Sequence, residues 1–394
     1  MAKTPKIPIN PKVLKWARTT LGYTSEEIAT KMGVDSKRLN AWEDGSDIPS
    51  FAQLRKIAEV FKRPTAAFFL NDIPHDPAIP KDFRVVNEAT IHKLAPKTII
   101  EIRKAQRKRL VALEISAGLG EDIPGFNDRA TLNDDVKLLA AKYRKKIGVT
   151  DEVQDNFTNQ YDAFNYWKIG IEATGVLIFQ ASLESLDEMR GLAVYEKNLP
   201  FILLNTKDSP RAKIFSLLHE FCHLLLHTSG IGNITPNWKQ TKSFNKIEVF
   251  CNAFAAECLV PTVNLLQELK SKGVSAGTVS VTTINALVRR YEASTEVVLR
   301  RLLDTQFITN RQYREARQRL HEQYKNTPKK EGGFVPPDVK ALAYNGDLYT
   351  KLVLDGYAQD KITAGDVTDY LGVKYQHLSK IEQTLRDRKK RAEE

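Results

Sequence analysis

The sequence predicts an α+β protein that is mostly helical, and three observations support this fold class. Helix signals recur along the chain, beginning with the capping box of Thr24 and Glu27 and the helix-ending Gly33. Only three short apolar runs, GVLIFQ, GLAVYE and FILLN, are typical of strands. The chain has 394 residues, of which 42% are hydrophobic and 27% charged, so it is long and apolar enough for several globular domains.

Charge and cysteine content limit the class of protein. A formal net charge of +11 has the sign expected of a protein that binds polyanions. No apolar run reaches the roughly 18 residues of a membrane span, and the N-terminal MAKTPKIPIN lacks the apolar stretch of a secretion signal. The cysteines, Cys222, Cys251 and Cys258, are too few for a disulfide framework. We therefore expect a cytoplasmic protein without a membrane partner.

Residues 1–74 are predicted to form a DNA-binding domain of five short helices. Two of these helices, within residues 24–43, are joined through GVD as in a helix-turn-helix, and Leu39 and Trp42 of the second should pack inward. Such domains usually bind palindromic operators in double-stranded DNA as dimers, so we expect a homodimer. The polar residues that could reach phosphates or base edges are Ser25, Ser36, Lys37, Arg38 and Asn40.

Residues 75–145 are predicted to be a basic helical connector. Arg103 and Arg107 lie four residues apart, as do Lys104 and Lys108, so these side chains form one stripe along a helix. Two interpretations of this stripe are equally supported: a helix face that is only solvated, and a face that contacts phosphates.

Residues 146–324 are predicted to mix helices with the three short strands. A helix over 161–173 precedes the strands, and two further helices follow, over 209–228 and 245–259. Of the strands, GLAVYE is preferred over FILLN as an edge on which an extended peptide could lie by β-augmentation.

The sharpest chemical signal is an HExxH motif formed by His219, Glu220 and His223. Four residues turn an α-helix through about 400°, so the two imidazoles stand about 6 Å apart on one face and can share one Zn²⁺. Glu220 can reach a metal-bound water without being a ligand. The alternative, incidental histidines, is disfavoured because unpaired polar groups on an apolar helix are costly.

A catalytic zinc needs a third protein ligand, and the following helix offers two carboxylates. Glu248 is preferred because Asn252, four residues later, lies on the same face and could hydrogen-bond a ligand histidine. Glu257 remains an alternative. His227 lies about 12 Å along the helix axis from His219, so we expect it behind the ligands or at the surface.

The C-terminal part is predicted to be a linker followed by a small helical unit. Residues 325–338 are rich in Pro, Gly and Lys, and residues 339–394 return to helical patterns. Within them, residues 363–382 align without a gap with residues 24–43. We therefore expect a second helix-turn-helix-like hairpin, for which a structural role is preferred over a binding role.

Two parts of the chain resemble known families. The segments SPRAKIFSLLHEFCHLLLHTSG and EVFCNAFAAECLVP resemble the ImmA/IrrE metallopeptidases, which carry HExxH and a downstream E-x-x-x-[ND]-x-F-A-A-E block. The segment GVDSKRLNAWEDGSDIPSFAQLRKIAEVFKRP is similar to the Xre-type helix-turn-helix, which is often fused to that peptidase. The resemblance implies a gluzincin-like domain with His219, His223 and Glu248 as zinc ligands and Glu220 as general base. It assigns Glu257 to packing or hydrogen bonding.

The resulting prediction is a DNA-binding transcriptional regulator fused to a zinc-dependent endopeptidase. The resemblance implies an antitoxin, stress-response or mobile-element regulator that acts on a protein substrate or a toxin partner. The alternative is a non-proteolytic repressor or antitoxin whose zinc-site domain only binds a metal or a toxin. A third possibility is a peptidase whose helix-turn-helix docks a protein instead of DNA.

Overall fold

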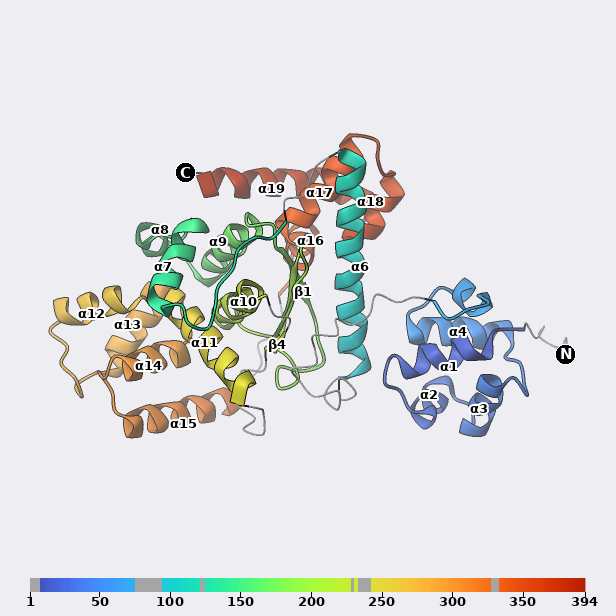
Figure 1. Ribbon diagram of the computed structural model, residues 1–394, viewed down its shortest axis with the longest axis horizontal. Helices are drawn as coiled ribbons and strands as arrows, with labels where there is room; N and C mark the ends of the chain where they lie inside the picture. The colour runs from blue at the N-terminus through green and yellow to red at the C-terminus, as the bar shows by residue number, and fades with distance from the viewer. Residues whose placement is uncertain are drawn as a thin grey trace. The chain divides into compact units, whose positions relative to one another are not determined.

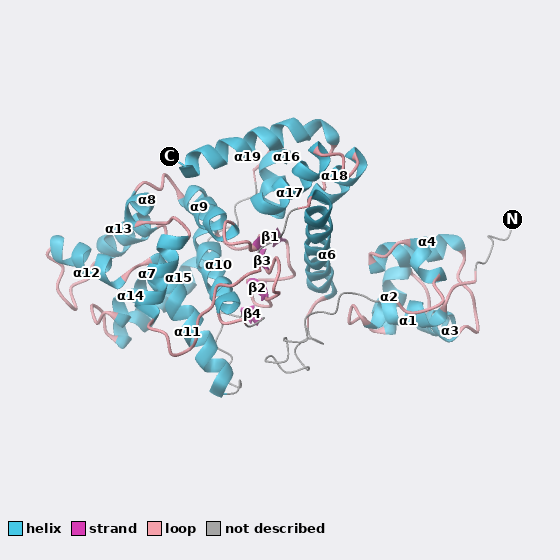
Figure 2. Cartoon of the chain, turned by 45° about the horizontal axis from the view of Figure 1, so that its top comes forward, coloured by secondary structure: helices cyan, strands magenta, loops and turns pink. Residues whose placement is uncertain are grey.

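The computed structural model describes residues 8–74, 94–120, 125–227, 230–232, 242–326 and 333–393. The chain divides into two compact units, residues 1–107 and residues 108–394 (Figure 1). Helices dominate the described chain, and its strands form one sheet within the second unit (Figure 2). The prediction of a mostly helical α+β protein is confirmed.

The first unit contains a cluster of short helices. They are α1 (Pro11–Thr19), α2 (Ser25–Met32), α3 (Ser36–Asp44), α4 (Phe51–Phe61) and the 3-10 helix η1 (Thr65–Phe69). The predicted caps are present: Thr24 and Glu27 form a capping box on α2, and Gly33 ends the helix at a φ of 69°. Any side chain would be strained at this φ, which is why glycine suits the position.

The core of this helix cluster holds α3 firmly. Leu39 and Trp42 are fully buried, as predicted. Arg18 of α1 donates two hydrogen bonds, of 2.7 and 2.9 Å, to the carboxylate of Glu43. Because the Glu43 side chain is only 6% exposed, its charge is largely removed from the surface that α3 presents to solvent.

The sheet has four strands in the order β1-β3-β2-β4. They are β1 (Leu177–Ala181), β2 (Gly191–Val194), β3 (Phe201–Asn205) and β4 (Gly230–Gly232). β1 runs parallel to β3, whereas β2 is antiparallel to both β3 and β4. The expectation that GLAVYE forms an edge is therefore wrong: β4, which had no sequence signal as a strand, pairs with it.

The sheet packs on the helix that carries the HExxH motif. Ile178, Ala193 and Ile202 join one apolar core with residues of the surrounding helices. The helices of this part of the chain are α7 (Val136–Lys146), α8 (Asp151–Asp155), α9 (Gln160–Glu172), α10 (Pro210–Leu225), α11 (Lys242–Leu259), α12 (Thr262–Ser271), α13 (Val281–Tyr291), α14 (Thr295–Asp304) and α15 (Asn310–Asn326). α10 contacts both β2 and β3, so the motif lies against these strands.

Of the C-terminal helices, α16 and α17 pack against β1 (Figure 1). The ring of Tyr349 meets that of Phe179 edge-on at 5.6 Å, and Phe179 in turn contacts Phe201. The helices are α16 (Pro337–Asn345), α17 (Asp347–Ala358), α18 (Ala364–Leu371), η3 (Tyr375–His377) and α19 (Leu378–Glu393). Residues 327–332 of the predicted linker lie outside the described residues.

The α18–α19 hairpin reproduces the features that its sequence shares with α2–α3. Thr363 forms a capping box with Asp366, and Gly372 ends α18 in the left-handed conformation. The positions equivalent to the apolar core of the first hairpin are buried as well: Val367, Leu371, Leu378 and Ile381. Its second helix differs, because it begins with the 3-10 turn η3 and extends much further.

The basic stripe within α6 (Pro96–Leu119) is divided by its contacts. Lys104 and Arg107 are exposed. Lys108, by contrast, donates a 2.6 Å hydrogen bond to Asn345 and lies over the rings of Phe179 and Tyr349. The four side chains therefore do not form one continuous face that could contact phosphates, because Lys108 is bound to residues of the second unit.

Within the described residues, no single helix has the length and apolar composition to cross a membrane. The bent pair formed by residues 246–259 and 262–271 meets those two criteria. Several of its apolar side chains, among them Phe254 and Leu265, are buried in the core of the second unit, whereas Val249 and Val263 are exposed.

Candidate metal centre and DNA-binding surface

The HExxH residues lie in the interior of α10. Ser209 caps the helix by accepting a hydrogen bond from the backbone N–H of Ala212, and Pro210 occupies the first turn, where a missing N–H costs nothing. Every residue from 216 to 225 is buried. His219 and His223, one turn apart on this stretch, must therefore find their partners within the protein.

Glu248 of α11 supplies a carboxylate to both histidines. Its Oε1 lies 3.2 Å from Nε2 of His223, and its Oε2 lies 3.4 Å from Nε2 of His219. The two Nε2 atoms are 3.1 Å apart. One donor atom from each residue lies within 4.8 Å of the other two, so side chains from two helices converge on one point.

The electrostatics of this cluster favour a bound cation. Burial raises the pKa of Glu248, but hydrogen bonds from His219 and His223 outweigh burial and bring it to about 2. Burial lowers the pKa of His223, whereas Cys251 and Glu248 raise it, and the net result lies well above the ordinary value. A carboxylate that faces two imidazoles thus attracts positive charge, either as protons or as a metal ion.

Glu220 lies beside the cluster and is held against β2. Its carboxylate accepts a hydrogen bond from the backbone N–H of Ala193, and burial raises its pKa to about 7 against the opposing effect of the histidines. Gly191 provides the space, because a Cβ there would lie 3.0 Å from Cγ and Oε1 of Glu220. A carboxyl group with this pKa can exchange a proton near neutral pH.

The residues fit a zinc ion. Two imidazoles and one carboxylate are an established protein donor set for catalytic zinc, which keeps a further position open. Among the described residues, Oε2 of Glu220 is buried beside this cluster without a hydrogen-bond partner. Buried polar atoms are rarely left unpaired, so the centre is chemically incomplete with protein atoms alone.

Glu257, the alternative ligand, is placed elsewhere by the structure. Its carboxylate accepts hydrogen bonds from the backbone N–H and the hydroxyl of Thr262, at 2.7 and 2.8 Å, and pairs with Arg301. It therefore joins α11, α12 and α14, in keeping with the hydrogen-bonding role that the resemblance implies.

The two residues expected behind the ligands have different environments. His227 stacks on Tyr195, with ring centroids 4.4 Å apart, and its Nε2 lies 3.0 Å from the carbonyl oxygen of Asp128. It is not part of the cluster formed by His219, His223 and Glu248. The side-chain oxygen of Asn252 is buried without a hydrogen-bond partner in the described chain. The neighbouring Cys251, which was not among the predicted site residues, hydrogen-bonds His223.

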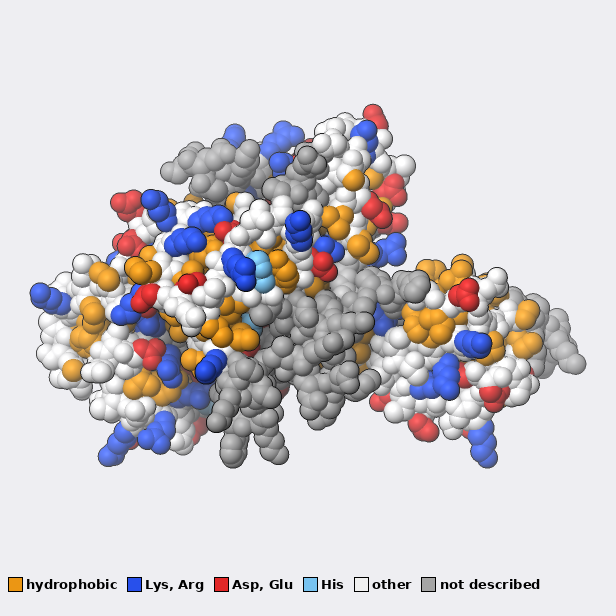
Figure 3. All heavy atoms as spheres, viewed as in Figure 1, with side chains coloured by type: hydrophobic (Ala, Val, Ile, Leu, Met, Phe, Trp, Pro, Cys, Tyr) orange, Lys and Arg blue, Asp and Glu red, His pale blue; other side chains and the backbone are white. Residues whose placement is uncertain are grey.

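The helix-turn-helix presents the expected polar residues unevenly. Lys37 and Asn40 are exposed on α3, while Ser25 and Ser36 are half-buried at helix starts. Arg38 is exposed but lies over the ring of Trp42 and forms an ion pair with Asp47 at 3.6 Å. On the face shown in Figure 3, acidic and basic side chains are interspersed. Lys37 and Asn40 are therefore the side chains best placed to reach DNA.

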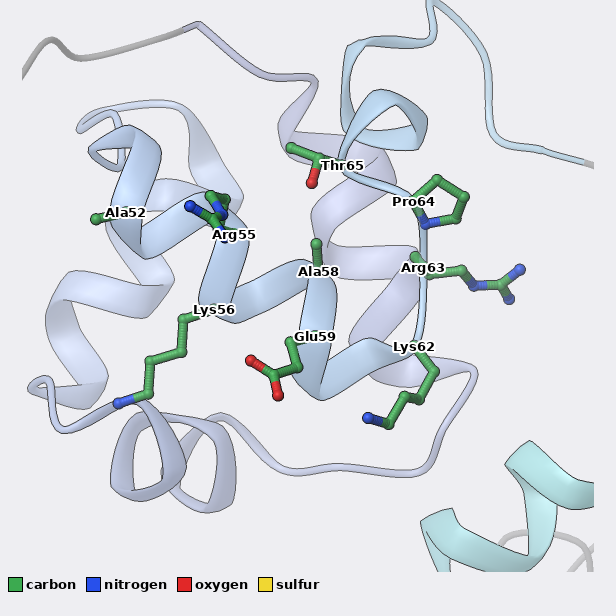
Figure 4. Close-up of a pocket in the computed structure, with 9 residues that line it drawn as sticks. All are labelled: Ala52, Arg55, Lys56, Ala58, Glu59, Lys62, Arg63, Pro64 and Thr65. Atoms are coloured by element: carbon green, nitrogen blue, oxygen red, sulfur yellow. The ribbon is translucent and has the colours of Figure 1, made fainter. Parts of the chain in front are cut away.

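A basic groove on the same unit had no signal in the sequence. It follows α4 and the segment after it, and its lining includes the side chains of Arg55, Lys56, Lys62 and Arg63 with one carboxylate, Glu59 (Figure 4). Lys56 donates a hydrogen bond to the carbonyl oxygen of Met32 at the end of α2. The groove adds positive charge close to the helix-turn-helix, which favours contact with a polyanion.

Comparison with known families agrees with this architecture. Residues 14–68 match the family model described as a helix-turn-helix, and residues 171–303 match the peptidase M78 model, described as an IrrE N-terminal-like domain. No curated protein matches the sequence. The second match contains α10, α11 and their three converging side chains. The predicted fusion of an Xre-type helix-turn-helix with an ImmA/IrrE-like domain is confirmed.

Proposed function

We propose that this protein is a DNA-binding regulator whose second unit is a zinc-dependent endopeptidase acting on a protein partner. The observation that carries the proposal is the convergence of His219, His223 and Glu248, with Glu220 beside them, inside the IrrE-like domain. An antitoxin, stress-response or mobile-element role, with a toxin or a repressor as substrate, follows from the family resemblance. The helix-turn-helix supports double-stranded DNA as the other partner, bound by a homodimer.

The residues of the centre have distinct roles in this proposal. His219, His223 and Glu248 would hold the zinc. When bound, Zn²⁺ supplies Lewis-acid chemistry that makes water more acidic and polarises a peptide carbonyl. Glu220 accepts the proton of the attacking water on its carboxylate and later returns it to the leaving amine. The hydrogen bond from Ala193 orients this carboxylate.

The test of the peptidase compares the wild type with Glu220→Gln. Each full chain is loaded with Zn²⁺ and incubated with a lysate of the source organism, and newly formed protein N-termini are mapped by mass spectrometry. We expect new N-termini with the wild type and with the matched variant Glu315→Gln, whose carboxylate is on exposed α15. Glu220→Gln should bind zinc but produce none.

The same experiment separates the proposal from its alternative. If wild type and Glu220→Gln give the same N-termini while both bind zinc, the second unit only binds a metal or a toxin partner. The proteolytic proposal is then wrong, and repression at DNA would be the whole activity.

The DNA-binding half is tested by gel shift on duplex DNA from the region upstream of the chain's own gene. Lys37→Ala should weaken binding about tenfold, and Arg38→Ala should weaken it less because Arg38 is engaged by Asp47 and Trp42. Lys361→Ala, an exposed change in the second unit, is the control. Unchanged affinity for the Lys37 variant would show that α3 does not contact the DNA.

A further inference from the structure

Two buried thiols lie directly behind the metal-binding cluster. Cys222 follows Phe221 inside the HExxH motif on α10, and Cys251 lies on α11, three residues after Glu248. Both side chains are fully buried, and neither forms a disulfide. The thiol of Cys251 is hydrogen-bonded both to Cys222 and to the ring of His223.

The orientation of the His223 ring decides which nitrogen meets the thiol. Its Nε2 faces Glu248 at 3.2 Å and Nε2 of His219 at 3.1 Å. The other ring nitrogen, Nδ1, is therefore the one that can hydrogen-bond the thiol of Cys251. A histidine that ligates through Nε2 carries its proton on Nδ1, and a hydrogen bond from that N–H fixes both tautomer and ring orientation.

We propose that Cys251 positions His223 for metal binding by accepting the hydrogen bond of its Nδ1–H, and that Cys222 supports Cys251 by accepting the hydrogen of its thiol. This inference rests on the proposed metal centre. In most metal sites the acceptor behind a ligand histidine is a carboxylate, a carbonyl or a water. Here a pair of thiols from the two packed helices takes that place.

The neighbouring residues agree with this assignment. The oxygen of Asn252, which the sequence places as the hydrogen-bonding partner of a ligand histidine, has no hydrogen-bond partner in the described chain. Nδ1 of His219 likewise has none there, although its ring lies beside that of Phe215 at 6.3 Å. The thiols therefore orient the ring of His223 only. The ring of His219 is held by its packing beside Phe215.

The test measures zinc affinity of the full chain by competition with a chromophoric chelator. Cys251→Val keeps an apolar side chain of similar size but removes the acceptor, so zinc should bind about 10 to 100-fold more weakly. Cys251→Ser retains an acceptor oxygen and should stay within about threefold of the wild type on that scale. Cys258→Val is the matched control, because Cys258 is a fully buried thiol of the same helix that is absent from the metal-binding cluster.

Two results would overturn the inference: equal zinc affinity for Cys251→Val and the wild type, or a loss in Cys251→Ser as large as in Cys251→Val. A second measurement needs neither the variants nor zinc. In the metal-free wild type with ¹⁵N-labelled histidine, nitrogen NMR should show a proton on Nδ1 of His223, whether or not Nε2 also carries one toward Glu248. A ring with no proton on Nδ1 would contradict the proposal. A wild type that binds no zinc but has the Nδ1 proton would instead refute the proposed peptidase.

Discussion

At the scale of single residues, the centre depends on one close approach between a strand and a helix. Gly191 begins β2 directly against the side chain of Glu220, and Ala193 on the same strand donates to its carboxylate. The HExxH motif predicts that a glutamate is present but not what orients it. In the sequence, the only trace of this orientation is Gly191, the glycine that precedes LAV. Its role could not be inferred before the structure showed that β2 lies against α10.

Gly191→Ala should therefore impair the proposed peptidase without unloading the metal. The new Cβ would lie 3.0 Å from Cγ and Oε1 of Glu220, so the carboxylate must shift by a few tenths of an ångström. Since a misplacement of about 1 Å can cost about 100-fold in rate, we expect a loss of about tenfold in the formation of new N-termini. Gly365→Ala, with ordinary contact distances, is the control, and full activity of the Gly191 variant would show that the close approach is unimportant.

Lys213 gives the stability of the protein a pH dependence above neutrality. Its ammonium lies over the Phe164 ring and donates to Gln180 at 2.9 Å, and burial lowers its pKa from 10.5 to about 8. The folded state therefore binds fewer protons than the unfolded state between these values, and its stability rises with pH across that window.

The measurement is urea unfolding at pH 8 and pH 10.5 for the wild type and for Lys213→Met. Between the two pH values, the free energy of unfolding of the wild type should rise by about 2 kcal/mol more than that of the variant. Other titrating groups are common to both proteins, so the difference isolates Lys213. Parallel stability curves would show that this ammonium is well solvated in the folded state.

At the scale of elements, the ends of α11, α12 and α14 meet at one buried ion pair. Glu257 accepts from the first turn of α12 and pairs with Arg301, which also donates to the carbonyl oxygen of Val260. Both charged side chains are less than a tenth exposed. Removal of one partner of such a pair leaves the other charge buried and uncompensated.

Glu257→Ala should consequently destabilise the second unit by about 3 kcal/mol, measured as the change in the free energy of unfolding in urea. Glu315→Ala, which breaks the exposed pair with Arg311, should change it by less than about 0.5 kcal/mol. Zinc binding by any folded fraction of the Glu257 variant should persist. A loss of zinc in a fully folded variant would instead make Glu257 a candidate ligand again.

At the scale of the whole chain, local signals predicted elements well and long-range packing poorly. Caps and apolar periodicity identified α2, α3, α10 and α11, because these depend on neighbours in sequence. The pairing of β4 with β2 and the packing of the C-terminal helices on β1 depend on contacts far apart in the chain. No periodicity encodes them, and the three residues of β4 carry almost no strand signal.

A buried charge cluster shows how the C-terminal helices are fixed to the second unit. Lys168 of α9, only 1% exposed, donates to the carboxylate of Asp347 at 2.6 Å, and Arg388 of α19 donates to the same oxygen at 2.9 Å. Glu172 accepts from the backbone N–H of Asp347. Gly346 has a φ of 77°, and a Cβ there would overlap Glu172 and Ile178. The contacts of Lys168 and Glu172 with Asp347 join segments 179 and 175 residues apart.

Asp347→Asn should thus loosen the C-terminal helices. The change preserves shape but leaves the Lys168 ammonium buried without its nearest negative partner, at a cost of about 3 kcal/mol in the free energy of unfolding. Hydrogen exchange followed by mass spectrometry should show faster exchange in α16 and α17 and along β1, which they cover, while α1–α4 exchange as in the wild type. Asp338→Asn is the comparison, because its partner Lys380 is 65% exposed and can be solvated when the pair is broken. If both variants exchange alike, the Lys168–Asp347 pair does not anchor these helices, and apolar packing around Tyr349 alone must hold them on the sheet.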